Sequence, residues 1–124
     1  MLLSRLKKNI GQQYEDLALA FLQQNGATLL QRNYQTRYGE IDLIMEDQQH
    51  CLLFIEVRFR RSKNYGGAAS SVDRKKQQKL IKTANHFISS QLIDQAMRFD
   101  VIAISPAANK QHEIQWLKNA FDEF

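Results

Sequence analysis

Residues 39–60 read GEIDLIMEDQQHCLLFIEVRFR, two apolar strand-like runs joined by a short polar segment. Asp42 lies inside the first run, Glu56 near the end of the second, and Arg58 follows on the same strand. Burying a carboxylate without a partner costs several kcal/mol or forces the group to stay protonated. Two carboxylates at the border of an apolar core therefore predict a site that binds a cation.

Side-chain alternation decides which of these groups lie on one face. Successive side chains of a strand point to opposite faces, so Asp42 shares a face with Ile44, and Glu56 shares a face with Arg58. The polar residues 47–50 predict a hairpin loop between the two runs. If the hairpin sets the two faces side by side, three ionisable groups converge on one spot.

Helices and further strands are predicted on either side of this hairpin. Apolar residues recur at helical spacing over 10–24, and Asn25-Gly26 supplies a helix stop. A second amphipathic helix follows Ser70 or Ser71, either of which could be its N-cap. The strand-like runs cover residues 27–36, 40–46, 51–60, 98–104 and 112–117. The order helix, three strands, helix, two strands predicts the α/β class, a mixed five-stranded sheet flanked by helices that begins with an antiparallel meander.

Composition bounds the class of protein. The chain has 124 residues, 44% of them hydrophobic, which suits one domain over residues 1–124 whose core needs no disulfide. Cys51 is the only cysteine and is interpreted as a small core residue, in keeping with a reducing cytoplasm. Only Met1-Leu2-Leu3 precedes the first charges, and no apolar run reaches about 18 residues, so neither a signal peptide nor a membrane partner is expected.

The charge balance favours an anionic partner. Lys and Arg number 17 against 13 Asp and Glu, a formal net charge of +4. Basic residues cluster after the Glu56 strand and at the start of the second helix, where they could follow a phosphate backbone, although such runs are commonly plain solvated surface. The candidate nucleic-acid contacts are Arg37, Arg60, Arg61, Lys63, Lys75 and Lys76.

Two carboxylates followed by a cation match the layout of metal-dependent nucleases that cut phosphodiesters. Mg²⁺ keeps several waters, so one or two carboxylates and a phosphate oxygen are enough to hold it against a substrate. Such an ion polarises the phosphate and activates a water molecule. Asp42 and Glu56 are therefore predicted metal ligands, with Mg²⁺ or Mn²⁺ as the cofactor. The three histidines are dispersed without ligand spacing, which argues against zinc.

Motifs along nearly the whole chain occur in an arrangement typical of one family. They are Gly11, Glu15, Ala18, Leu22, Arg32-Asn33-Tyr34, Gly39 to Ile44, Phe54 to Arg58, Arg60, Gly66, Lys75-Lys76, Arg98-Phe99-Asp100 and Ala120-Phe121. This set resembles the YraN family of small uncharacterised bacterial proteins. Through that family the sequence is similar to the restriction-endonuclease-like superfamily, and most closely to archaeal Holliday-junction resolvases, whose signature is a helix glutamate, a strand aspartate and Glu-x-Lys.

The resemblance implies a restriction-endonuclease-like fold and a set of catalytic residues. Glu15 matches the helix glutamate, Asp42 the aspartate and Glu56 the second acid, while Arg58 occupies the position of the signature's lysine. The implied partner is nucleic acid, DNA rather than RNA, and a symmetric junction would favour a homodimer.

Arg58 departs from the lysine of the signature. Lysine can release a proton when its pKa is lowered, whereas arginine stays charged and can only bind or stabilise anions. If the chain is catalytic, either a metal-bound water suffices or Lys75 or Lys76 reaches the site from the helix start. Otherwise the chain has kept a nucleic-acid groove and lost cleavage.

Structural interpretations compete for several charged residues. Asp42 could pair with Arg58 as an ion bridge, because perturbed acids also occur in purely structural networks. Glu40 is expected to form a salt bridge at a strand start, and Asp100 to partner Arg98 or an adjacent basic residue.

Aromatic residues carry a similar ambiguity. Tyr34, Tyr38 and Tyr65 could stack on unpaired bases, although tyrosines near turns are commonly half-buried packing residues. Trp116 alternates with Ile114 in the last strand and is expected in the core.

These observations predict a nucleic-acid-binding, nuclease-like protein, a metal-dependent phosphodiesterase for branched or structured DNA. Asp42 and Glu56 are its metal ligands, Glu15 is an outer or third carboxylate, and Arg58 contacts the scissile phosphate. The alternatives are a non-catalytic nucleic-acid-binding module that keeps the nuclease fold, and a protein-interaction domain with a structural ion pair.

Overall fold

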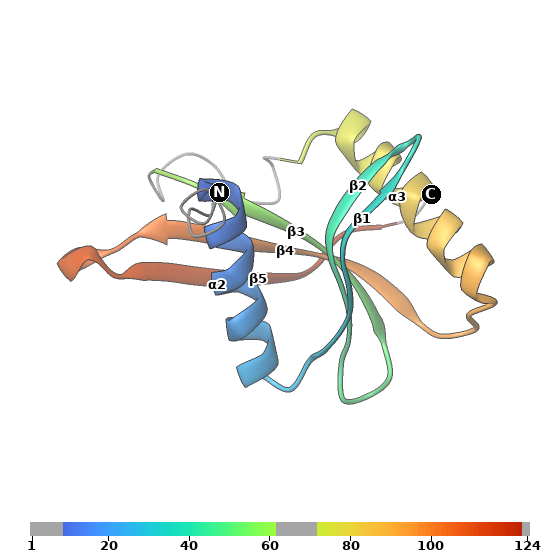
Figure 1. Ribbon diagram of the computed structural model, residues 1–124, viewed down its shortest axis with the longest axis horizontal. Helices are drawn as coiled ribbons and strands as arrows, with labels where there is room; N and C mark the ends of the chain where they lie inside the picture. Colours follow the sequence, from blue (N-terminus) through green and yellow to red (C-terminus); the bar gives the residue numbers. More distant parts are fainter. Residues whose placement is uncertain (1–8, 62–71, 123–124) are drawn as a thin grey trace, which may run out of the picture.

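The computed structural model describes residues 9–61 and 72–122 (Figure 1). Lys63, Tyr65 and the two serines expected to cap the second helix lie outside these residues. The elements are α2 (Ile10–Gln24), β1 (Thr28–Thr36), β2 (Gly39–Glu46), β3 (Leu52–Phe59), α3 (Arg74–Gln91), β4 (Met97–Pro106), the 3-10 helix η2 (Ala108–Lys110) and β5 (His112–Phe121). The predicted order of helix, three strands, helix and two strands is confirmed.

The five strands form one mixed sheet in the order β1-β2-β3-β4-β5. The first three pair antiparallel, β3 pairs parallel with β4, and β4 pairs antiparallel with β5. A parallel pair needs a crossover connection, and α3 lies in that connection. Figure 1 shows the sheet strongly twisted, so that the β1–β2 ribbon crosses the direction of β3, β4 and β5.

Each helix covers one face of the sheet. Alternating apolar side chains of the central strands divide into two buried clusters, as strand geometry requires. The α2 face contains Ala18, Leu22, Leu43, Met45, Leu53, Ile55, Ile102 and Ile104. The α3 face contains Ile41, Ile44, Leu52, Phe54, Leu80, Ala84, Phe87, Phe99 and Val101. Neither described helix has the length and apolar character needed to cross a membrane.

Side-chain caps set where both helices begin. The Asn9 side chain accepts a hydrogen bond from the Gln12 N–H at 2.8 Å. Asp73 caps α3 by accepting from the Lys76 N–H at 2.8 Å. The cap of α3 therefore lies later in the chain than the serines suggested, and it places Lys76 in the first turn of the helix.

Strand β5 extends beyond the predicted end, as far as Phe121. A register shift opposite Phe99 and Val101 allows the extension, and Asn119 there takes a left-handed conformation with φ 52. The Asn119 N–H donates to the Asp100 carboxylate at 2.8 Å. A carboxylate on the neighbouring strand thus holds the irregularity in place, which no local pattern in 112–121 indicates.

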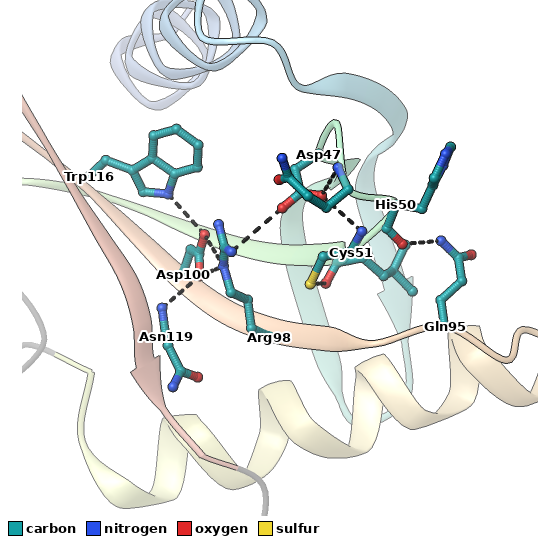
Figure 2. Close-up of polar contacts among 10 residues, drawn as sticks. Asp47, His50, Cys51, Gln95, Arg98, Asp100, Trp116 and Asn119 are labelled. Atoms are coloured by element: carbon teal, nitrogen blue, oxygen red, sulfur yellow. Dashed lines mark hydrogen bonds and ion pairs between the residues drawn. The ribbon is translucent and has the colours of Figure 1, made fainter.

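Asp100 is buried and fully provided with donors (Figure 2). Its oxygens accept from Arg98 Nε at 3.0 and 3.1 Å, from Trp116 Nε1 at 2.9 Å and from the Asn119 N–H. The expected pairing with Arg98 is confirmed. Trp116 is half-buried against the α2 face rather than fully in the core, because its indole N–H must reach Asp100.

Cys51 lies in the adjacent β2–β3 connection. It is half-buried beside the α2 face, and its thiol contacts the Leu52 carbonyl at 3.8 Å, so the expected core position is correct only in part. The carboxylate of Asp47 accepts from the Cys51 N–H at 2.9 Å and lies 3.6 Å from Arg98 (Figure 2). This loop is therefore fastened to β4.

Replacing Asp100 with alanine should destabilise the protein strongly. The change leaves the Arg98 guanidinium, the Trp116 indole and the Asn119 N–H without their common acceptor, so the free energy of unfolding should fall by about 3–5 kcal/mol. Urea unfolding followed by circular dichroism measures the loss. The exposed Asp94→Ala is the matched control, with a change of about 0.5 kcal/mol or less. A loss no larger than that of the control would contradict the role of Asp100.

Candidate functional site

Strands β2 and β3 separate immediately before two carboxylates. Their last paired residues at this end are Leu43 and Ile55, and the next residue on each strand is Asp42 or Glu56. Beyond the fork, β2 continues beside β1 and β3 continues beside β4. The Val57 N–H donates to the Asp42 carboxylate at 2.8 Å. The Asp42 side chain thus takes over as acceptor where the ladder between β2 and β3 stops.

A cleft of about 250 Å³ opens at this fork. The start of α2 forms one wall, where the Tyr14 ring stacks on Phe59 with ring centroids 4.4 Å apart. The structure thereby brings the three predicted acids of helix and strands to one place. The cleft is lined by Gly11, Tyr14, Glu15, Asp42, Glu56, Val57 and Phe59.

The electrostatics of the cleft disfavour a full set of negative charges. Burial raises the pKa of Asp42 to about 7, and the charges of Glu56, Glu15 and Glu40 add to the rise, while the Val57 hydrogen bond opposes it. Burial also raises the pKa of Glu56, although neighbouring cations partly offset that effect. A bound cation would relieve this crowding of carboxylates.

Two cations contact Glu56. Arg58 Nε and Lys76 Nζ each lie 3.7 Å from Glu56 Oε1. The interpretation of an Asp42–Arg58 ion bridge is not what the structure shows, because Arg58 contacts Glu56 and Asp42 accepts from a backbone N–H. Among the described residues, none donates a hydrogen bond to the buried Glu56 Oε2. One carboxylate oxygen at the fork therefore has no donor within residues 9–61 and 72–122.

Lys76 is the lysine that reaches the site from the helix start. The Asp73 cap turns the first residues of α3 so that Lys76 points at Glu56, whereas Lys75 is exposed. The sequence left open whether Lys75 or Lys76 takes the place of the lysine in the resolvase signature. The contact with Glu56 favours Lys76. The selection could not come from the sequence, because the cap position decides which side of the helix faces β3.

Glu15 is held by residues of β1. Its oxygens accept from Asn33 Nδ2 at 2.9 and 3.1 Å and lie 3.4 Å from Arg32 Nη2. Asn33 Nδ2 also donates to Glu40 at 3.0 Å. The sequence indicated Asn33 only as part of the Arg32-Asn33-Tyr34 motif, and its φ of 51, which asparagine tolerates well, is the feature that turns its amide toward both acids.

Among the described residues, no cation forms the salt bridge predicted for Glu40. Glu40 accepts from two amides instead, Asn33 at 3.0 Å and Gln35 Nε2 at 3.3 Å. Both donors come from β1, whose pairing with β2 places Gln35 opposite Glu40. Neutral amides leave the negative charge of Glu40 available to the cleft.

The remaining predicted nucleic-acid contacts do not all gather at the cleft. Arg60 and Arg61 follow the end of β3, Arg60 half-buried and Arg61 exposed. Arg37 is exposed at the tip of the β1–β2 hairpin, where it donates to the Tyr38 hydroxyl at 2.9 Å. Of this set, the structure brings only Lys76 into contact with a carboxylate of the cleft within the described residues.

The donor set fits a weakly held divalent ion. Within residues 9–61 and 72–122, no group of three or more His, Cys, Asp or Glu side chains is arranged to hold a metal. Asp42 and Glu56 remain as candidate ligands, since two carboxylates suffice for Mg²⁺ when water and a phosphate complete the shell. The unpartnered Glu56 Oε2 supports this fit. Glu15, held by Asn33 and Arg32, lines the cleft beside these two carboxylates.

Comparison with known proteins places the chain in a family. Residues 14–104 match the family model described as "Uncharacterised protein family UPF0102". The chain belongs to the UPF0102 family. The resemblance to the YraN family, which is the same family, is thereby confirmed.

UPF0102 relatives match over nearly their whole length. A UPF0102 protein of Nitrosomonas europaea is 48% identical over 93% of this chain and 95% of its own, and one of Alcanivorax borkumensis is 42% identical over 98% of each chain. Among solved structures, the chain is similar to Pyrococcus furiosus SfsA in complex with Ca²⁺, with a TM-score of 0.35 and 9% identity. That match covers 87% of this chain and 62% of SfsA, less than two thirds of it.

Replacing Asp42 with asparagine should flatten part of the pH dependence of stability. Between about pH 4 and pH 7 the native Asp42 keeps a proton that the unfolded chain releases, so its contribution to stability falls as the pH rises through that window. At about pH 8 the variant should therefore be more stable than wild type by about 1–2 kcal/mol, with little difference at about pH 4. Urea unfolding at several pH values measures the difference. If the stability difference between Asp42→Asn and wild type stays constant from acid to alkaline pH, the raised pKa of Asp42 is contradicted.

Proposed function

We propose that this UPF0102 protein is a cytoplasmic, nucleic-acid-binding nuclease, a metal-dependent phosphodiesterase for branched or structured DNA. The observation that carries the proposal is the fork between β2 and β3, where the half-buried Asp42 and the buried Glu56 line an open cleft and Lys76 contacts Glu56. Mg²⁺ or Mn²⁺ is the proposed ion, and Asp42 and Glu56 would hold it. When bound, the ion would polarise the phosphate and lower the pKa of a bound water.

The two cations of the site suit different tasks. Arg58 offers the fixed, planar set of guanidinium donors, so it suits a phosphate oxygen whose charge grows during cleavage. Lys76 offers an ammonium group on a flexible stem beside Glu56, so it suits orienting a water or neutralising charge there. Both now contact Glu56 Oε1, and a phosphate entering the cleft would compete for them.

A non-catalytic nucleic-acid-binding module is the second candidate. The observation that favours it is the pairing of Glu56 with both Arg58 and Lys76, which neutralises that carboxylate without a metal. With a pKa of about 7, Asp42 is also partly protonated at neutral pH. This candidate predicts salt-dependent DNA binding that survives, or improves on, removal of the Asp42 charge.

Cleavage of labelled four-way-junction, flapped and linear DNA with Mg²⁺ or Mn²⁺ separates the two candidates. Asp42→Asn should lower the cleavage rate at least about 100-fold, because it removes a ligand charge, and Lys76→Ala should lower it at least about tenfold. Lys118→Ala is the control, since Lys118 is exposed on β5 and is not among the predicted nucleic-acid contacts, and it should keep the rate within about twofold.

Three results would count against the phosphodiesterase. Asp42→Asn protein that cuts as fast as wild type removes the assigned role. Wild-type protein that binds these DNAs but cuts none of them with either ion favours the non-catalytic module. If the protein neither binds DNA nor responds to metal, the charged residues of the site have a structural role.

Metal should raise the melting temperature in a pH-dependent way. An ion that binds only the native state stabilises it by mass action, by about 2.7 kcal/mol at a hundredfold excess over the dissociation constant. Because protons compete for Asp42, the rise should be larger at about pH 8 than at about pH 6. Differential scanning fluorimetry with Mn²⁺ measures it. Asp42→Asn and Glu56→Gln should abolish the rise, and an unchanged rise in both would place the ion elsewhere.

A further inference from the structure

Two adjoining pockets lie outside the carboxylate cleft, between the tip of the β1–β2 hairpin and α3. One has a volume of about 440 Å³ and the other about 330 Å³, and Tyr38 and His86 line both. The first is also lined by Lys82, Asn85 and Ser89, and the second by Gln35, Thr36 and Arg37. Their shared wall is thus a half-exposed aromatic ring among polar and basic groups.

Two cations lie over the Tyr38 ring. The Arg37 guanidinium carbon lies 5.0 Å from the ring centroid, and Lys82 Nζ lies 5.9 Å from it. Cations at this distance are attracted by the face of an aromatic ring. A ring with a cation from the hairpin and another from the helix offers a stacking surface that is bordered by positive charge.

The hairpin is held firmly against α3, so the pockets exist before any ligand binds. Thr36 Oγ1 lies 3.4 Å from Thr83 Oγ1, and the Tyr34 hydroxyl lies 2.6 Å from His86 Nδ1. A Cβ built at Gly39 would lie 3.6 Å from Lys79 Cβ, so the turn itself contacts the helix. A preformed surface loses less conformational freedom on binding than a mobile one.

A row of lysines connects these pockets to the cleft. Lys76, Lys79 and Lys82 recur at a spacing of three residues, so each neighbours the next in a row that runs obliquely around α3. Lys76 contacts Glu56 in the cleft, and Lys82 lies over Tyr38. At 1.5 Å of rise per residue, these two lysines are separated by roughly 9 Å along the helix. The row can follow a strand backbone that leaves the cleft.

We propose that the Tyr38 pockets bind an unpaired nucleotide of the substrate. Its base stacks on Tyr38, and Arg37, Lys79 and Lys82 contact the flanking phosphates. Every base has a π-face, so such a surface accepts unpaired strands without sequence preference, and a duplex, whose bases are already stacked, cannot use it. The inference rests on the proposed function, because it assigns to that site a substrate with a single-stranded segment.

The test is binding in EDTA, where metal-dependent cleavage cannot occur. Fluorescence anisotropy with single strands of about 12 nucleotides, one of DNA and one of RNA, and with a duplex of the same length reports affinity. In whichever strand binds more tightly, Tyr38→Ala should weaken binding about tenfold, and Tyr38→Phe and Tyr38→Trp should keep it within about twofold. Duplex affinity should change by less than about twofold in all three variants.

The salt dependence of single-strand binding gives a second measurement, in which the Tyr38 ring is left unchanged. For single strands, the slope of log affinity against log salt becomes shallower by about 0.7 for each phosphate that the protein no longer neutralises. Lys82→Gln should therefore reduce the slope by about 0.7, while Lys118→Gln, on β5 beside Trp116, should leave it unchanged. Equal slopes for the two variants would overturn the role of Lys82.

Failure of this inference can be told apart from failure of the phosphodiesterase. Equal strand affinities of Tyr38→Ala and Tyr38→Phe overturn the stacking site, even if the protein cuts DNA. Tyr38-dependent strand binding without cleavage supports the stacking site and overturns the phosphodiesterase. Loss of binding in Tyr38→Trp also overturns the inference, because tryptophan still offers a ring on which a base can stack. Displacement of the strand by an equally charged poly-glutamate peptide overturns it too, because that peptide carries negative charge but no base.

Discussion

The hydrogen bond from the Val57 N–H to the Asp42 carboxylate is the interaction on which the site depends. It lies where the β2–β3 ladder stops, and it lets two strands part without leaving that half-buried N–H unpaired. Because the acceptor is a side chain, the Asp42 carboxylate is drawn into the sheet at this point and lies at the wall of the cleft. Burial there and the charge of the neighbouring Glu56 raise the pKa of Asp42.

Two buried carboxylates of this sheet, Asp100 and Glu56, differ in how fully their oxygens are supplied with hydrogen-bond donors. Asp100 accepts from a guanidinium, an indole and a backbone N–H, so it stabilises the junction of β4 and β5 and has little capacity for a ligand. Glu56 contacts its cations at longer distances, and in the described part of the chain one of its buried oxygens has no donor. The second arrangement is costly for folding, and a bound cation would offset the cost.

Prediction succeeded where the pattern is local and failed where a partner comes from another element. Helical periodicity and the Asn25-Gly26 stop defined α2, since both signals lie within the helix itself. The α3 cap, the reach of Lys76 and the amide partners of Glu40 were missed or left open. Each depends on which side of one element meets another, and sequence spacing along a single element carries no such information.

The sequence by itself determined the element order, the mixed sheet and the presence of acids in two apolar strands, because hydrophobic periodicity and strand alternation are properties of a segment. Only the tertiary structure decided that those acids lie at a fork, that Asn33 joins Glu15 to Glu40, and that Lys76 is the lysine at Glu56. The physical reason is that electrostatic and hydrogen-bond partners are chosen by distance in space. Strand divergence and helix caps set that distance.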